Sequence, residues 1–147
     1  MNKEQAKGII GKVVEDGKPV IYKFVNEIPS SEIQDKLPLL TVISWKYEGS
    51  QRNGMPEQSD NQRMIKLEDA IEDGVESNGA CRHAYSRTGN NLKELVYYIH
   101  NRDEFLETLN QTLSNHTRYP IDISFYEDKK WEDFQKLLND FSGAKNR

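Results

Sequence analysis

Hydrophobic and polar residues follow two different periods between residues 37 and 126. Alternating apolar and polar positions predict β-strands, whereas apolar positions three and four residues apart predict helices. In chain order the patterns predict a strand, a helix, two strands, a helix and a strand, at residues 37–47, 64–75, 80–87, 92–100, 101–113 and 121–126. This is the order of the split βαβ, or ferredoxin-like, unit. We therefore expect an α+β fold, with a βαββαβ antiparallel sheet and both helices on one face.

Polar residues at the ends of these segments predict helix caps and a hairpin turn. Ser59, with Gln62 three residues later, resembles a capping box for the first helix. Residues 88–91 have the composition of a tight turn between two adjacent strands. Asp128 is expected to be the N-cap of a final helix at residues 129–141.

Two elements extend the unit, an extra N-terminal strand at residues 18–28 and the C-terminal helix. We expect the extra strand to pair with residues 37–47, which makes a five-stranded sheet, and the helix to lie at the edge or over the open face. Before the strand, Ile9 and Val14 fit either a short helix or an edge segment. Residues 142–147 are expected to fray.

Length and charge narrow the classes of protein. The 147 residues fit a single domain, with a core over about 18–141, and 35% hydrophobic against 30% charged residues is typical of a globular chain. A net charge of −4 gives no general attraction for nucleic acid or anionic membranes. No stretch has the apolar length of a membrane span, and the first residues lack the apolar core of an export signal. We therefore expect a cytoplasmic protein without a membrane partner.

Few residues combine in a way that suggests catalysis. Cys81 is the only cysteine, which excludes an internal disulfide, and His83 shares its strand face. A thiolate beside an imidazole begins a nucleophilic site, but no third group orients the histidine, so we interpret Cys81 as a small buried residue. No two histidines have the spacing of helical metal ligands. We expect no catalytic residue, no metal and no cofactor.

Two features leave both a structural and a functional interpretation open. Asp69, Glu72, Asp73 and Glu76 share one helical face, which is either simply solvated or meets a basic partner. The loop at residues 49–59 contains a Gly-Met-Pro turn and is either a plain crossover or a binding loop.

Binding residues are expected where aromatic and arginine side chains gather, since these types dominate interface energies. We predict a contact surface that combines one sheet face with the loop just described and with Glu94 of the hairpin. Its candidate residues are Trp45, Tyr47, Gly54, Pro56, Arg82, Glu94 and Tyr98.

Two alternative functions would each require a particular set of residues on one face of the sheet. An enzyme would use Arg82, His83, Tyr85 and Glu94 around the hairpin, which requires His83 and Glu94 on the same face of the sheet. An RNA-binding module would use the strand aromatics, but it needs a basic face that the sequence does not display, so nucleic acid is not expected as a partner.

Several short segments together resemble one bacterial family, the domain of unknown function 695. The resemblance extends from the first strand to the last helix, and the segments that carry it are Trp45-Lys46-Tyr47, Gly54-Met55-Pro56, Leu67-Glu68 with Ile71, Thr88-Gly89, Glu94 with Tyr97-Tyr98, and Asp128-Lys129-Lys130-Trp131.

The resemblance implies no established activity and no agreed catalytic residues. Similar domains occur joined to one that resembles the bacterial protein inhibitor of ribonuclease E, itself ferredoxin-like, which implies a regulatory role by analogy. The leading hypothesis is therefore a small non-catalytic module that binds another protein. A homo-oligomer stays open, because sheet edges of this fold can pair.

Overall fold

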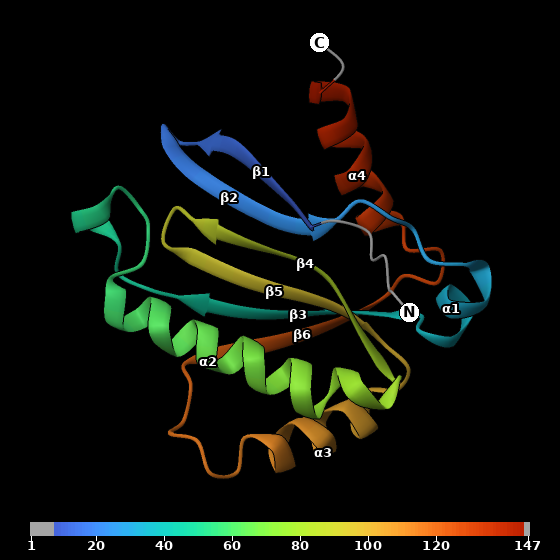
Figure 1. The fold of residues 1–147 in the computed structure, drawn as a ribbon. Coiled ribbons are helices and arrows are strands. Elements are labelled where there is room, and N and C mark those ends of the chain that lie inside the picture. The colour runs from blue at the N-terminus through green and yellow to red at the C-terminus, as the bar shows by residue number, and fades with distance from the viewer. Residues whose placement is uncertain (1–7, 146–147) are drawn as a thin grey trace.

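The computed structural model describes residues 8–145, without the side chains of Asn78 and residues 143–145. Within this part six strands form one antiparallel sheet in the order β1-β2-β4-β5-β3-β6 (Figure 1). The strands are β1 (Gly8–Glu15), β2 (Lys18–Val25), β3 (Leu39–Lys46), β4 (Cys81–Gly89), β5 (Leu92–Ile99) and β6 (Ile121–Glu127). The helices are α1 (Ser31–Lys36), α2 (Gln58–Gly74), α3 (Arg102–Thr112) and α4 (Glu132–Lys145), with short 3-10 turns η1 (Ser50–Arg52) and η2 (Glu76–Asn78).

Four strands, in the order β6-β3-β5-β4, form the ferredoxin-like unit with α2 and α3. The expected α+β fold with a ferredoxin-like antiparallel sheet is therefore confirmed. None of the helices in the described part of the chain is long and apolar enough to span a membrane.

The expected place of the extra strand is wrong. β2 pairs with β4 and not with β3, and β1 pairs with β2, so the sheet of residues 8–145 has six strands and not five. The reason is that β3 is the inner strand of the unit, with β5 on one side and β6 on the other. A new strand can only add at an edge, and β4 supplies that edge. The segment around Ile9 and Val14 is an edge strand, one of its two predicted forms.

α2 and α3 cover one face of the sheet with the predicted helical stripes. Met64, Leu67, Ile71 and Val75 are all buried, together with Phe105 and Leu109 of α3. They pack against the odd-numbered side chains of β3 and β5, including Ile43, Leu95, Tyr97 and Ile99. The side chains that alternate onto one face of the strands and those on the apolar stripes of the helices therefore form one core.

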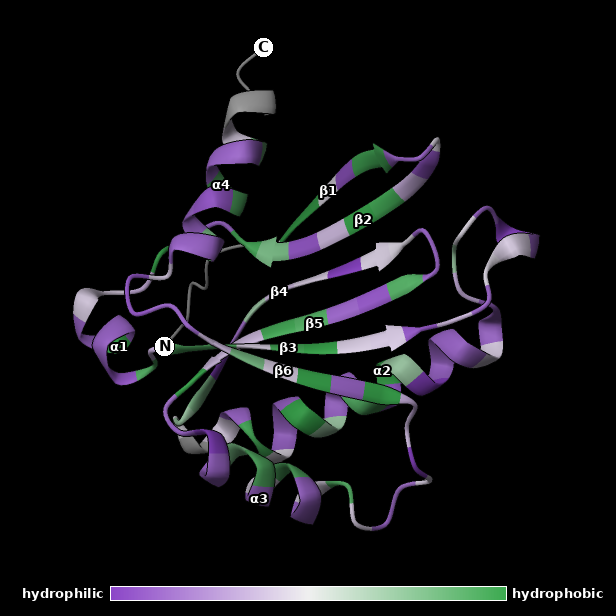
Figure 2. Cartoon of the chain, turned by 180° about the vertical axis from the view of Figure 1, so that it is seen from behind, coloured by the Kyte–Doolittle hydropathy of each residue, from purple (hydrophilic) through white to green (hydrophobic). Residues whose placement is uncertain are grey.

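α4 covers part of the opposite face. Trp131, Phe134 and Leu137 pack on Phe24, Val96 and Tyr98, which decides between the two expected positions of this helix. Figure 2 shows α4 beside β1 and β2, whereas α2 and α3 lie toward β3 and β6. A Cβ atom at Gly11 would overlap the ring of Phe141, so glycine at this point of β1 lets α4 approach the hairpin.

The predicted starts of two helices, α2 and α4, need correction. α2 begins at Gln58 after Glu57, which makes no side-chain cap, so Ser59 lies inside the helix and the predicted capping box is wrong. α4 begins at Glu132 and not at 129, yet the Asp128 carboxylate accepts from the N–H groups of Glu132 and Asp133 at 2.8 and 3.0 Å.

Residues 142–145 continue α4 and do not fray, and residues 146–147 lie outside the described part. Residues 31–36, between β2 and β3, form the short helix α1.

The hairpin between β4 and β5 turns as predicted. Asn90 and Asn91 both have positive φ, 49° and 68°, which is the requirement of a two-residue type I′ turn. Near the other end of the hairpin, β4 has a register shift between His83 and Tyr85. β2 pairs with β4 only from Tyr85 to Gly89, so within the described residues the first part of β4 has no neighbouring strand on the β2 side.

Trp131→Ala should lower the free energy of unfolding by about 3–5 kcal/mol, because a buried aromatic side chain is lost together with its stacking contact to Tyr98. The indole is 1% exposed and its ring lies 3.9 Å from that of Tyr98, nearly parallel. Chemical denaturation monitored by circular dichroism measures the change. Tyr126→Ala, at a side chain 54% exposed on β6, is the control and should cost less than about 1 kcal/mol.

Candidate functional site

A cleft of about 450 Å³ opens beside the first part of β4, where β2 has ended. Loop, helix and strand residues from four regions of the chain surround it: Val25, Glu27, Pro29, Glu72, Glu76, Arg82, His83, Ala84, Trp131 and Phe134. The register shift and the end of β2 at Val25 leave this space, since a longer β2 would continue along the edge of β4. The cleft therefore combines an open strand edge with a concave surface.

The apolar side of the cleft is rigid. Phe134 comes from the first turn of α4, Trp131 immediately precedes that helix, and Ala84 comes from β4. The Trp131 indole N–H donates to the carbonyl of Leu37 at 2.9 Å, and its ring stacks on Tyr98 with an interplanar angle of 9°. A side chain held by both a hydrogen bond and a stack gives the cleft a rigid, preformed base.

The polar side of the cleft is acidic. Three glutamates and one arginine line it, and Glu27 and Glu72 are exposed. Burial raises the pKa of Glu76, and the main-chain N–H of His83, which donates to Glu76 Oε1 at 3.3 Å, opposes that shift. The carboxylate thus occupies a donor on the strand edge that a neighbouring strand would otherwise take.

His83 is half-buried against the sheet, and its imidazole is neutral. Burial lowers its pKa to about 4, and the Lys93 ammonium adds to the effect. The imidazole packs edge-on against Tyr97 with a centroid distance of 5.3 Å. At neutral pH it is therefore an uncharged ring.

Cys81 shares the face of His83, as the alternation predicts. Burial raises the pKa of the thiol, and the nearby Glu76 carboxylate raises it further. A thiol in this state does not form the thiolate that nucleophilic catalysis requires. Among the described residues no three His, Cys, Asp or Glu side chains are grouped so that they could hold a metal ion.

The predicted contact surface is not one face of the sheet. Trp45 and Tyr47 lie under α2, whereas Tyr98 lies on the α4 face, and all three are buried. Trp45 is further covered by the guanidinium of Arg63, 5.4 Å from its ring. Of these candidates only Arg82 lines the cleft, because it lies opposite Tyr98 in the register of β4 and β5. The expectation that these four side chains share a face is wrong.

Glu94 and His83 lie on opposite faces. Glu94 follows the parity of Val96 and Tyr98 on the α4 side, whereas His83 pairs with Tyr97 on the α2 side. Burial raises the pKa of Glu94, and the Arg87 guanidinium counteracts this. The enzyme site that would combine His83 with Glu94 is therefore excluded by the geometry.

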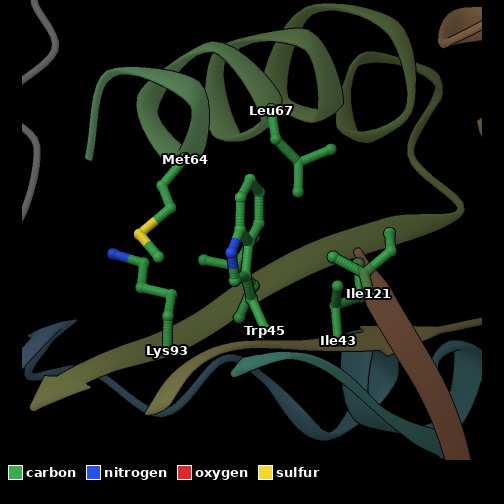
Figure 3. Close-up of a pocket in the computed structure, with 7 residues that line it drawn as sticks. Ile43, Trp45, Met64, Leu67, Lys93 and Ile121 are labelled. Atoms are coloured by element: carbon green, nitrogen blue, oxygen red, sulfur yellow. The ribbon is translucent and has the colours of Figure 1, made fainter. Parts of the chain in front are cut away.

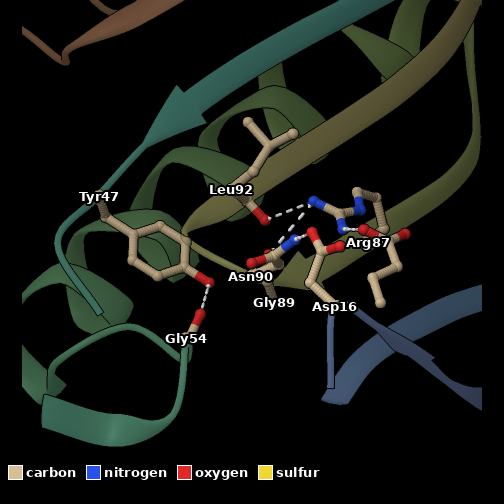
Figure 4. Close-up of polar contacts among 8 residues, drawn as sticks. Asp16, Tyr47, Gly54, Arg87, Gly89, Asn90 and Leu92 are labelled. Atoms are coloured by element: carbon tan, nitrogen blue, oxygen red, sulfur yellow. Dashed lines mark hydrogen bonds and ion pairs between the residues drawn. The ribbon is translucent and has the colours of Figure 1, made fainter. Parts of the chain in front are cut away.

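The loop that contains Gly54 and Pro56 is held against the far end of the sheet. The Tyr47 hydroxyl donates to the carbonyl of Gly54 at 2.6 Å (Figure 4). The main-chain N–H of Asn91 donates to the same oxygen at 2.9 Å. Gly54 and Pro56 are both buried. The hydrogen bonds give Gly54 a structural role at the hairpin turn, and the buried Pro56 is not available to a partner.

Arg87 continues this polar network. Its guanidinium donates to the carbonyls of Leu92 and Gly89 at 2.9 and 3.3 Å and pairs with Glu15 at 3.1 Å, as Figure 4 shows for the labelled residues. Asn90 donates to Asp16 across the same turn region at 3.1 Å. The β1–β2 hairpin is thereby joined to the β4–β5 hairpin at their turns.

Lys93 is a buried charge that sequence reasoning missed. It lies between α2 and the sheet beside Trp45 and Met64, in a gap that leaves essentially no space for a water molecule (Figure 3). Its Nζ is 3.6 Å from Glu68 Oε1, and burial lowers its pKa whereas Glu68 opposes the change. The alternation of β5 contained the signal, since Lys93 has the parity of Leu95 and Tyr97.

Taken together, the fold and the cleft define an α+β protein with a ferredoxin-like unit, an added N-terminal hairpin and a C-terminal helix across its second face. The model of a family of unknown function, DUF695, matches residues 12–139, and the chain belongs to this family. The resemblance expected from the sequence is thus confirmed. No curated protein matches the sequence.

Acid should destabilise the protein partly through His83. The folded pKa of about 4 lies below the ordinary value of 6.5, so between these two pH values the unfolded chain binds more protons and stability falls as the pH falls. The contribution is on the order of 2–3 kcal/mol. His83→Phe, which keeps an aromatic ring beside Tyr97, should lose less stability than the wild type between pH 7 and pH 4.5, measured by urea denaturation.

His100→Gln is the matched control, because His100 is exposed at the end of the same hairpin. It should keep the pH dependence of the wild type. If His83→Phe and the wild type lose stability in parallel, His83 is not a buried neutral imidazole.

Proposed function

We propose that this protein is a non-catalytic module that binds an extended segment of another protein in the cleft beside β4. The observation that carries the proposal is the strand edge at residues 81–84, which has no neighbouring strand on the cleft side within the described residues. An extended peptide that adds to such an edge gains main-chain hydrogen bonds, and pockets beside the edge then select its side chains.

The contact between His83 and Glu76 supports strand addition. At 3.3 Å the N–H of His83 makes a long hydrogen bond to a half-buried carboxylate. A peptide carbonyl at ordinary distance would satisfy this donor better, and Glu76 would then be free to meet a positive charge. The edge is therefore protected by a side chain that a ligand can displace.

The lining of the cleft predicts the chemistry of the segment. Val25 adds an exposed apolar side chain to the nearly buried Trp131, Phe134 and Ala84, and the three glutamates outnumber Arg82. A segment with an apolar residue next to a lysine or arginine complements both parts, and charge complementarity also gives specificity. This composition distinguishes the expected partner from an acidic one.

The ionisation states favour binding over chemistry. His83 is neutral and shielded, the Cys81 thiol has a raised pKa, and Glu94 lies on the other face of the sheet. The groups that would have to cooperate in catalysis are thus separated or held in unreactive forms.

A bacterial, cytoplasmic and regulatory setting is part of the same proposal. The buried free thiol of Cys81 is compatible with a reducing compartment, where single cysteines persist without pairing.

A phage library of random extended peptides, panned on the protein, should enrich sequences with lysine or arginine beside an apolar residue. Binding of a fluorescein-labelled synthetic peptide of the enriched sequence is then measured by fluorescence anisotropy. Glu27→Lys, which reverses an exposed charge on the cleft, should raise the Kd about tenfold or more.

Glu107→Lys makes the same charge change at an exposed position on α3, outside the residues that line the cleft, and should leave the Kd unchanged. Absence of enrichment over an unrelated protein, or an equal effect of the two substitutions, would contradict the proposal.

A further inference from the structure

The β1–β2 hairpin leaves part of the sheet uncovered on the side of α2 and α3. Through the strand register, Ile10 and Lys12 share the face of Lys23 and Ile21, and that face continues through Ser86 to Leu95 in the core beneath α2. In Figures 1 and 2 α2 and α3 lie toward β3 and β6, and β1 and β2 form the opposite end of the sheet. The hairpin thus extends one face of the sheet beyond its helical cover.

This uncovered face is apolar and positively charged. Ile10 and Val14 are 71% and 68% exposed, more than the other large hydrophobic side chains that are exposed in the described part. Lys12 lies between them on β1, and Lys23 lies opposite Ile10 on β2; both lysines are exposed. An edge strand with two exposed β-branched residues on one face is typical of a surface that a partner covers.

The outer stripe of α2 has the complementary character. Met64, Leu67 and Ile71 point into the core, so Ile65, Asp69 and Asp73, at intervals of four residues, lie on the outer side of the helix together with Lys66. Ile65 is 48% exposed, and both aspartates are exposed. The two carboxylates outnumber Lys66, so this side of α2 has a net negative charge that complements the lysines of the hairpin, and Ile65 complements its isoleucine and valine.

We propose that two copies of the chain associate face to face, so that the outer stripe of α2 in each copy covers the β1–β2 hairpin of the other. The projecting helix and the uncovered hairpin lie on the same side of the molecule and at different ends of the sheet. A two-fold axis that runs along the strands exchanges these ends and brings each helix over the partner's hairpin. The contact is therefore isologous and closes after two copies.

The complementary charges allow a sharp test. Variant one carries Lys12→Glu and Lys23→Glu, and variant two carries Asp69→Lys and Asp73→Lys. In either variant alone, hairpin and helix have like charges, so the dimer dissociation constant should rise at least about tenfold. Mixing the two variants restores opposite charges at both contacts and should give a heterodimer.

Sedimentation velocity of the full chain at about 1–100 μM measures the association. The wild type should dimerise, and Lys136→Glu on α4, at an exposed position on the other side of the sheet, should dimerise equally well. A wild type that stays monomeric over this range, or a mixture of the two variants that stays monomeric, overturns the proposal. None of the four substituted residues lines the cleft beside β4, so peptide binding and dimerisation succeed or fail separately.

Discussion

The stack of Trp131 on Tyr98 is the interaction on which the packing of α4 against the sheet depends. The rings lie 3.9 Å apart, the indole N–H bonds to Leu37, and the Tyr98 hydroxyl donates to Asp128 at 2.7 Å. One contact therefore connects the central strands, the end of α1 and the start of α4. It turns a sheet face that ferredoxin-like units can leave open into a second core, and it makes Trp131 a fixed wall of the cleft.

The two ends of the β4–β5 hairpin differ in a way that bears on function. At its turn, Arg87 and Gly54 take part in networks that join the neighbouring loops, and the β1–β2 hairpin is attached there. At the other end, β2 stops and the register of β4 shifts, so the strand edge is open. A closed end and an open end on one strand give a stable scaffold that presents a short edge of β4 for pairing.

Burial decides the chemistry of the titratable groups near that edge. It keeps His83 neutral, raises the pKa of the Cys81 thiol and raises the pKa of Glu76. The same residue types in a solvated cleft would be candidates for acid–base or nucleophilic work. Here they leave an apolar and acidic lining, and for this reason we propose recognition of a protein segment rather than catalysis.

The sequence by itself determined the ferredoxin-like unit, the hairpin turn and the stripes of α2 and α3, because alternation and helical period report which residues face a core. It also placed Arg82 among the binding candidates, although its aromatic candidates proved to be buried. Only the tertiary structure decided that β2 joins β4, that Tyr98 lies under Trp131 and that Glu94 and His83 are separated. These features depend on which strand of the sheet has a free edge and on how the bulge in β4 changes the face to which its side chains point. Contacts between segments distant in the chain leave no periodic pattern in the sequence.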